Sequence, residues 1–213
     1  MRNRDLQLRG DRAVEIETPR GVARAETIKP RGKIGSWLLL GHGAGGDVGS
    51  ADLTAVTEAA VAAGVAVALV TQPYRVAGRK APAPAPQLDE AWLAVVAELR
   101  RTAKIKVPLI VGGRSSGARV ACRTALDSGA AGVVALAFPL HPPGRPEKTR
   151  DEELATGVPT LVVNGDRDPF GVPDARPGLD LVVLPGERHD LRKDPSAVAA
   201  AVVGWLRSHD WAR

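Results

Sequence analysis

The chain has few of the residues that support disulfide or metal-cluster chemistry. Its single cysteine, Cys122, excludes an intrachain disulfide and a cysteine-based metal cluster. The apolar residues around Cys122 indicate a small buried residue rather than a reactive thiol. No apolar run approaches the length of a membrane span, and the charged stretch of residues 1–10 lacks the apolar core of a signal peptide. We therefore expect a cytoplasmic protein that does not associate with membranes.

Aromatic residues are also scarce, at 3% of the chain. The formal net charge of +5 could suggest a nucleic-acid partner, but the basic residues are scattered and few aromatic rings are present for base stacking. We interpret the charge as a solvated, arginine-rich surface and expect no nucleic-acid partner. The length of 213 residues fits one α/β domain over residues 1–213. The oligomeric state is left open.

Short apolar runs alternate with segments of helical spacing, a pattern typical of βαβ units. Runs that are apolar on both faces suit strands of a parallel sheet with helices on both sides. Helical spacing covers residues 53–61, 92–99 and 198–205, and residues 13–28, with a turn at 19–21, predict an antiparallel hairpin at one edge. The candidate strands are residues 37–40, 65–70, 107–111, 133–137, 160–163 and 181–184.

Two segments depart from this alternation. Residues 81–86 alternate alanine and proline, so they predict an extended connector before the next helix. Residues 141–157 separate two candidate strands and are the only place for a lid. Because that stretch is too short for a large cap domain, we expect a fairly open site.

The most informative motif is Gly-x-Ser-x-Gly at Gly113, Ser115 and Gly117. It follows the strand at 107–111 and opens a helix near Ser116, which is the context of a nucleophile elbow. The first amides of that helix could stabilise a developing oxyanion. Ser116 is the weaker nucleophile candidate because it lacks the flanking glycines. The alternative interpretation is a glycine-rich turn with an N-capping serine.

A second glycine-rich loop follows the strand at 37–40. Gly41, Gly43 and Gly46 satisfy the dinucleotide pattern G-x-G-x-x-G. The same loop could instead supply half of an oxyanion hole, with the backbone N–H of Ala44 or Gly43 on one side and that of Ser116 on the other. We favour the oxyanion interpretation, because the residues after this loop do not fit a dinucleotide site.

The residues after this loop argue against a dinucleotide site. Such a site needs an acidic residue at the end of the next strand, and Val70 is followed by Thr-Gln-Pro. Arg75 could serve a phosphorylated ribose, but the next helix is expected to begin near Ser50 or Asp52 rather than on the last glycine. In the oxyanion interpretation His42 organises the loop and is not the catalytic base.

An activated serine needs a base, and the base needs an orienting acid. Asp168 follows the strand at 160–163 and is our candidate acid, with Asp166 as the alternative or as a turn cap. His189 follows the strand at 181–184 and is the candidate base. His141 could contact substrate. The carboxyl ends of parallel strands share one edge of the sheet, so these residues should converge there.

With these motifs the chain resembles the α/β-hydrolase superfamily, and more closely a group of small bacterial hydrolases similar to dienelactone hydrolase. The resemblance implies an eight-stranded, mostly parallel sheet and Ser115, Asp168 and His189 as a catalytic triad, with no metal or cofactor. Dienelactone hydrolase uses a cysteine nucleophile, so its substrate does not carry over. The segments that carry the resemblance are residues 41–46, 112–117, 140–144, 164–171 and the loop of His189.

The resulting expectation is a serine hydrolase that forms an acyl-enzyme on Ser115. Its substrates would be small carboxylic esters, lactones or thioesters. Many relatives have methionine where Ser116 stands, and that difference leaves the acyl preference open. Because some relatives in eukaryotic chromatin complexes resemble binding modules, a non-catalytic interaction module is the alternative. A nucleotide-binding protein that uses residues 41–46 is the third hypothesis.

Overall fold

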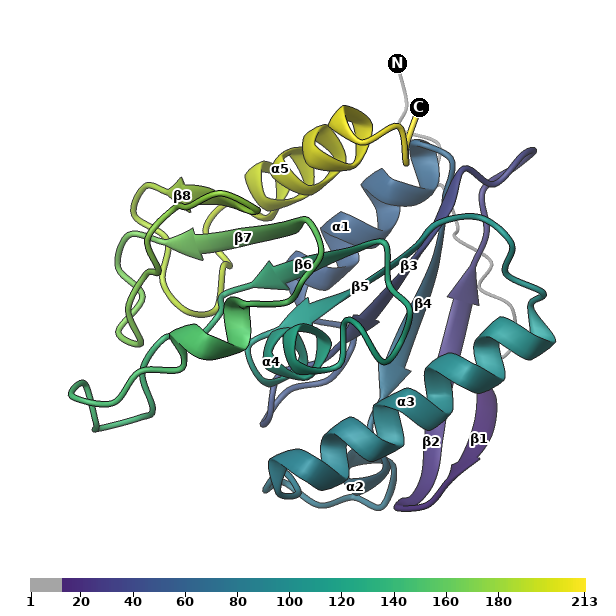
Figure 1. Cartoon of the computed structure of the whole chain (residues 1–213), viewed down its shortest axis with the longest axis horizontal. Coiled ribbons are helices and arrows are strands. Elements are labelled where there is room, and N and C mark those ends of the chain that lie inside the picture. The colour runs from purple at the N-terminus through teal and green to yellow at the C-terminus, as the bar shows by residue number, and fades with distance from the viewer. Residues whose placement is uncertain (1–12) are drawn as a thin grey trace.

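The computed structural model describes residues 13–213, so the stretch examined for a signal peptide lies outside the described residues. Its centre is an eight-stranded sheet in the order β1-β2-β4-β3-β5-β6-β7-β8 (Figure 1). The sheet is parallel from β4 to β8, and β1 and β2 join it antiparallel as a hairpin. This confirms the predicted mostly parallel sheet and its N-terminal hairpin. The strands are β1 Val14–Thr18, β2 Gly21–Ile28, β3 Ser36–Gly41, β4 Val65–Thr71, β5 Leu109–Arg114, β6 Gly132–Leu136, β7 Thr160–Gly165 and β8 Leu179–Leu184.

The strand bounds differ from the predicted ranges by up to three residues, and two departures from the sequence prediction have a clear physical reason. β5 begins at Leu109 rather than at residue 107, because Pro108 has no N–H to donate and contributes only its carbonyl, which accepts from Trp37. Residues 181–184 of β8 are apolar as predicted, but the expectation that helices cover both faces of every candidate strand does not hold for β8. That strand lies at the edge of the sheet, and Val183 is 41% exposed.

Helices cover both faces of the sheet, as expected for parallel strands that are buried on both sides (Figure 1). Two apolar clusters result, one on each face. α1 and α5 cover one face, and their buried residues include Leu53, Val56 and Val202. The other face is covered mainly by α3 and α4. The helices are α1 Ala51–Ala62, α2 Pro73–Val76, α3 Ala85–Thr102, α4 Ser116–Arg123 and α5 Pro195–Ser208.

The proline-rich connector is shorter than predicted. α3 begins at Ala85 and includes Pro86 in its first turn. Proline is tolerated there because the first N–H groups of a helix have no intrahelical partner. The prediction that all of residues 81–86 precede the helix is therefore wrong at its end. Between β6 and β7, where a lid could have been inserted, the chain forms a short 3-10 helix, η1 Asp151–Leu154.

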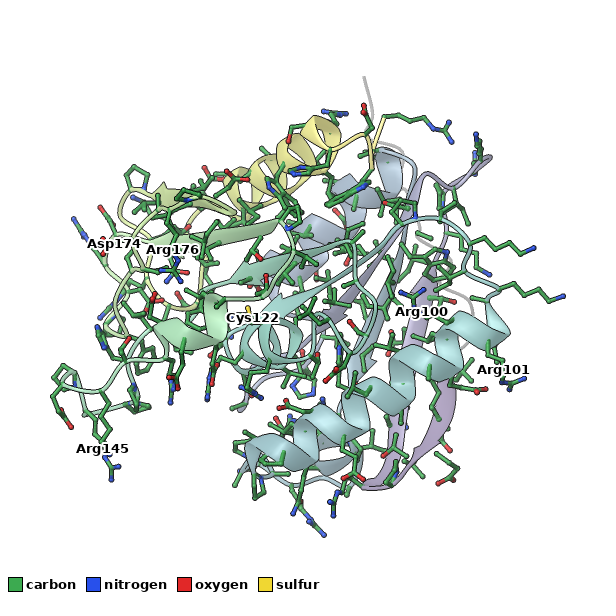
Figure 2. The ribbon with its side chains drawn as sticks, in the orientation of Figure 1. Arg100, Arg101, Cys122, Arg145, Asp174 and Arg176 are labelled. Carbon is green, nitrogen blue, oxygen red and sulfur yellow. The ribbon has the colours of Figure 1, made fainter. Side chains whose placement is uncertain are left out.

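The surface and interior fit the expected roles of the arginines and the cysteine. Arg101 and Arg145 lie on the outer surface, and Cys122 lies inside on α4 (Figure 2). Burial raises the pKa of the Cys122 thiol to about 12, so the reactive thiolate is suppressed. Within residues 13–213, no helix has both the length and the apolar character needed to cross a bilayer.

Candidate active site

Ser115 occupies the sharp turn between β5 and α4. Its backbone has φ 52° and ψ −106°, a conformation that costs a non-glycine residue about 1–3 kcal/mol and that persists only where the surroundings impose it. The backbone N–H of Ser115 donates to the carbonyl of Leu136 on the neighbouring strand, at 2.8 Å. The turn therefore places the Ser115 hydroxyl at the carboxyl edge of the sheet.

Close packing of the elbow against β3 explains the second glycine of the motif. A Cβ added to Gly117 would lie 2.4 Å from the carbonyl oxygen of Gly41, a distance that real Cβ atoms do not reach. Only glycine lets the start of α4 approach the end of β3 so closely. This contact brings the loop after β3 beside Ser115.

His189 joins Ser115 to Asp168. Its Nε2 lies 2.9 Å from the Ser115 Oγ, and its Nδ1 lies 2.8 Å from the Asp168 Oδ2. A carboxylate only accepts hydrogen bonds, so Nδ1 carries the proton and Nε2 is the acceptor that faces the serine hydroxyl. The ring of Phe170 packs edge-on against the imidazole, with centroids 4.5 Å apart. The structure thus brings together the three residues that we proposed from the sequence as a catalytic triad.

The two candidate acids have different partners. The Asp168 side chain is fully buried, and its Oδ1 accepts from the backbone N–H of Phe170 at 2.9 Å, which leaves Oδ2 for His189. The Oδ1 of Asp166 instead accepts from the backbone N–H of Gly186 at 2.7 Å and joins the segment after β7 to the turn after β8. The geometry therefore favours Asp168 as the partner of the imidazole.

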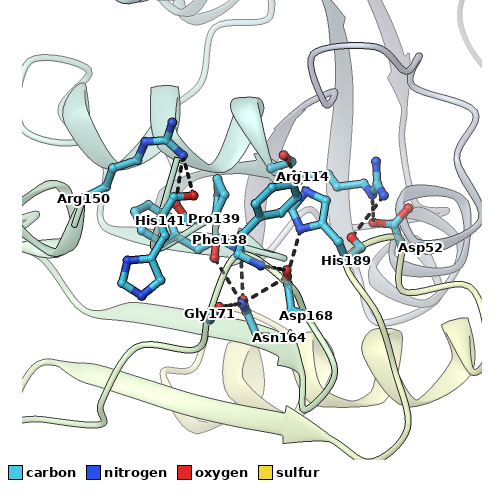
Figure 3. Close-up of polar contacts among 12 residues, drawn as sticks. Asp52, Arg114, Phe138, Pro139, His141, Arg150, Asn164, Asp168, Gly171 and His189 are labelled. Carbon is cyan, nitrogen blue, oxygen red and sulfur yellow. Dashed lines mark hydrogen bonds and ion pairs between the residues drawn. The ribbon is translucent and has the colours of Figure 1, made fainter. Parts of the chain in front are cut away.

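Asn164, which the sequence analysis did not single out for a role, fixes the loop of Asp168. Its buried side chain accepts from the N–H of Phe138 and donates to the carbonyls of Phe138 and Gly171, at 2.8, 3.1 and 3.2 Å (Figure 3). Its Nδ2 also approaches the Asp168 Oδ2 at 3.5 Å. One amide thereby ties the ends of β6 and β7 to the segment that carries the acid. An asparagine at the end of an apolar strand was the available signal.

A second residue missed from the sequence, Glu187, holds the loop of His189. It is buried, and its carboxylate accepts from the backbone N–H groups of Lys193 and Asp194. Its carbonyl packs so closely on β7 that a Cβ at Gly165 would lie 2.2 Å away. The loop that carries Asp168 and the loop that carries His189 are therefore in direct contact. No pattern in the sequence signals that a glutamate in this polar segment is buried.

The candidate oxyanion donors lie on two sides of Ser115. The first intrahelical bond of α4 runs from Arg119 to the carbonyl of Ser115, so the N–H of Ser116 belongs to the first turn and has no intrahelical acceptor. On the other side, a Cβ on Gly43 would lie 3.7 Å from the Ser115 Cβ. The adjacent Ala44 carbonyl accepts from the Tyr74 hydroxyl at 2.8 Å, which orients the peptide groups of this loop.

His42 has the structural role expected for it. Its Nε2 accepts from the backbone N–H of Gln72 at 3.1 Å, and its Nδ1 donates to the carbonyl of Gly43 at 2.8 Å. Burial lowers the pKa of His42, which matches a neutral imidazole with one accepting nitrogen. The loop also differs from a dinucleotide site, because α1 begins at Ala51 rather than on Gly46.

His141 lies on the loop after β6. Its Nδ1 donates to the carbonyl of Lys148 at 2.8 Å, and its ring packs against Gly171 beyond the acid loop. A contact of His141 with substrate stays a prediction. No cluster of three or more His, Cys, Asp or Glu side chains that could hold a metal ion occurs in residues 13–213.

Known proteins with similar structures have the same kind of fold as this chain. A family model described as an alpha/beta hydrolase domain matches residues 35–192. An a/b serine hydrolase without lid from Xanthomonas campestris is 19% identical, with a TM-score of 0.77 over 97% of this chain and 98% of the other. Dienelactone hydrolase from Anabaena variabilis is 18% identical, with a TM-score of 0.71 over 96% of this chain and 99% of the other.

A third similar structure is Est1E from Butyrivibrio proteoclasticus with ferulic acid bound. It is 17% identical, with a TM-score of 0.71 over 92% of this chain and 98% of the other. At these identities the likeness to solved structures establishes the fold, and the family model establishes the relationship. Because that model matches well over half of the sequence, the chain belongs to the alpha/beta hydrolase family.

Proposed function

We propose that this protein is a serine hydrolase that cleaves small carboxylic esters through an acyl-enzyme on Ser115. The observation that carries the proposal is the bridging position of His189, whose two ring nitrogens lie 2.9 Å from the Ser115 Oγ and 2.8 Å from the Asp168 Oδ2. A serine hydroxyl is a weak nucleophile unless a neighbouring base removes its proton. Here the base is in contact with the hydroxyl and is itself oriented by a buried carboxylate.

In the first half of the proposed reaction, Ser115 Oγ attacks the ester carbonyl carbon while its proton passes to His189 Nε2. Asp168 stabilises the imidazolium that forms and keeps the ring in place. The negative charge on the former carbonyl oxygen is stabilised by the N–H of Ser116 and by that of Gly43 or Ala44. Collapse of this intermediate breaks the ester bond, and the alcohol departs with the proton from His189.

In the second half, water replaces the alcohol. His189 removes a proton from the water molecule as its oxygen attacks the acyl-serine carbonyl, and the same donors stabilise the second oxyanion. Collapse expels Ser115, which recovers its proton from the imidazolium. The carboxylic acid product leaves, so the net reaction is ester plus water to acid plus alcohol. No metal or cofactor is needed in this sequence.

The substrate class follows from the kind of site and from the relatives. The structural relatives include a dienelactone hydrolase and a protein with ferulic acid bound, so carboxylic esters and lactones are the first compounds to test, followed by thioesters. The segment between β6 and β7 adds only η1, with no cap domain, and this supports an open site that accepts small, soluble esters.

A fluorophosphonate probe tests the proposal directly, because it forms a covalent bond only with an activated serine. We expect labelling of the wild-type protein and of Ser116→Ala, but not of Ser115→Ala. Labelling of Ser115→Ala that disappears in Ser116→Ala would refute the nucleophile assignment. A wild-type protein that is neither labelled nor active on a panel of short-chain aryl esters and thioesters would identify a non-catalytic member of the family.

A further inference from the structure

The proposed reaction leaves one buried charged group without a role. Asp52 lies in the first turn of α1, and its side chain is fully buried. Burial raises the pKa of its carboxyl, while the nearby Ser50 side chain and, after it, the charge of Arg114 oppose that shift. Its ion-pair partner is Arg114, with the guanidinium Nε 3.2 Å from the Asp52 Oδ2. A buried carboxylate is costly unless it is paired, so this pair calls for an explanation.

Arg114 is the residue immediately before the candidate nucleophile, and its guanidinium pairs with Asp52, donates to the main chain of His189 and lies beside the loop of Gly43. Nε faces Asp52, and Nη2 donates to the backbone carbonyl of His189 at 3.1 Å. Nη1 lies beside the glycine loop, where a Cβ on Gly43 would be 3.1 Å from it. Figure 3 shows dashed lines from the Arg114 guanidinium to the Asp52 carboxylate and to the backbone oxygen of His189.

These contacts join segments that are far apart in the sequence. The loop of Gly43 follows β3, Arg114 ends β5 and His189 follows β8. Connecting loops are the more mobile parts of a fold, and a displacement of about 1 Å at a reacting group can cost about a hundredfold in rate. A planar guanidinium with five donors in fixed directions can brace several loops at once, whereas a lysine ammonium presents a single point charge.

An ion pair that served stability alone would account for Asp52 but not for the other two contacts. Buried ion pairs add little net stability compared with apolar replacements. Nη2 donates to the main chain of the candidate base, and Nη1 lies next to the loop expected to supply an oxyanion donor. The Arg114 side chain is 15% exposed, so water has little access to its N–H groups and competes little for their hydrogen bonds.

We propose that Arg114 is a positioning residue that fixes the glycine loop and His189 on either side of Ser115, and that buried Asp52 holds the guanidinium in place. The proposal rests on the serine hydrolase function proposed above. Arg114 acts through its neighbours: the Nη2 bond sets the main chain that carries the imidazole, and Nη1 limits how far the Gly43 loop can move toward β5.

The test removes the guanidinium without leaving a buried charge. In the double variant Asp52→Asn/Arg114→Met, we expect turnover per active site to fall about ten- to a hundredfold, with KM within about threefold of wild type. Active sites are counted by fluorophosphonate titration, so a loss of folded protein lowers the count and not the turnover of each site. Arg114→Lys keeps the charge and should recover only part of the rate.

The matched control is Asp89→Asn/Arg123→Met, which removes a mostly buried ion pair between α3 and α4 at 2.6 Å together with the contact of Arg123 with Glu153 at 3.3 Å. We expect it to lower the melting temperature while turnover per site stays at the wild-type level. Wild-type turnover per site in Asp52→Asn/Arg114→Met, or an equal loss in the control, would overturn the positioning role.

A readout that does not depend on catalysis separates this proposal from the proposed function. The proton shared by His189 Nδ1 and Asp168 should give a low-field NMR signal, which we expect to shift in Asp52→Asn/Arg114→Met and to stay unchanged in the control. If the wild-type protein is not labelled by the probe, the hydrolase function fails, and the NMR signal still decides whether Arg114 positions His189. An unchanged signal in both variants would refute the positioning.

Discussion

Replacing Asp168 with asparagine should abolish most of the activity without removing any heavy atom from the site. The Oδ1 of Asp168 accepts from the backbone N–H of Phe170 at 2.9 Å, and its Oδ2 accepts from His189 Nδ1 at 2.8 Å. In Asp168→Asn the amide oxygen must stay at the Phe170 N–H, since an NH₂ group there would place donor against donor. The NH₂ group is then directed at His189 and donates to Nδ1.

That reversed hydrogen bond changes the tautomer of the imidazole. With Nδ1 accepting, the proton moves to Nε2, which now donates to the Ser115 Oγ and cannot receive its proton. The loss expected for a wrong tautomer is about 10⁴ in kcat, or about 5.5 kcal/mol at 1.36 kcal/mol per decade. Initial rates on a short-chain aryl ester measure it, with KM compared between variant and wild type.

Asp166→Asn is the matched control, since it makes the same change two residues away. Its Oδ1 accepts from the N–H of Gly186, and an amide oxygen can accept in the same way, so activity should stay near the wild-type level. A loss of less than about tenfold in Asp168→Asn, or a larger loss in Asp166→Asn, would show that the tautomer argument assigns the wrong acid.

Three further outcomes follow from buried polar groups. Asn164→Ala leaves the N–H and carbonyl of Phe138 without their partner, so urea denaturation should show unfolding free energy lower by about 2–4 kcal/mol. Burial lowers the pKa of His42 below its ordinary 6.5, so its stabilising contribution should be complete above about pH 6.5 and decline as pH falls; His42→Gln should flatten that decline in thermal melts. The buried Cys122 thiol, with its pKa raised to about 12, should react with a disulfide reagent only after unfolding.

Each of these has a result that would contradict it. Wild-type stability in Asn164→Ala would mean that water or another group satisfies the Phe138 backbone. A pH dependence of stability that is the same in His42→Gln would assign the titration to another group. Rapid modification of native Cys122 would show that α4 opens readily.

Much of the fold could be predicted because the same pattern of apolar runs and helical spacing recurs along the chain. Apolar runs on both faces, separated by helical spacing, require a sheet covered on both sides, and this placed the parallel strands. The turn at residues 19–21 placed the hairpin. Apart from the exposed edge strand β8, the errors lie at the ends of helices and strands, where a single residue sets the boundary. Pro108 delays the start of β5, and Pro86 enters the first turn of α3 because a helix needs no N–H there.

The amino-acid sequence by itself determined the chemical candidates and their order: a serine between glycines, then an acid, then a histidine, each after an apolar run. Only the tertiary structure decided which aspartate contacts the histidine. Both residues carry the same side chain, but the carboxylate of Asp166 accepts from Gly186 and that of Asp168 accepts from His189. The tertiary structure also decided the bracing roles of Asn164 and Arg114. Their partners come from distant segments, and burial and distance between such segments are set by packing, which no local pattern records.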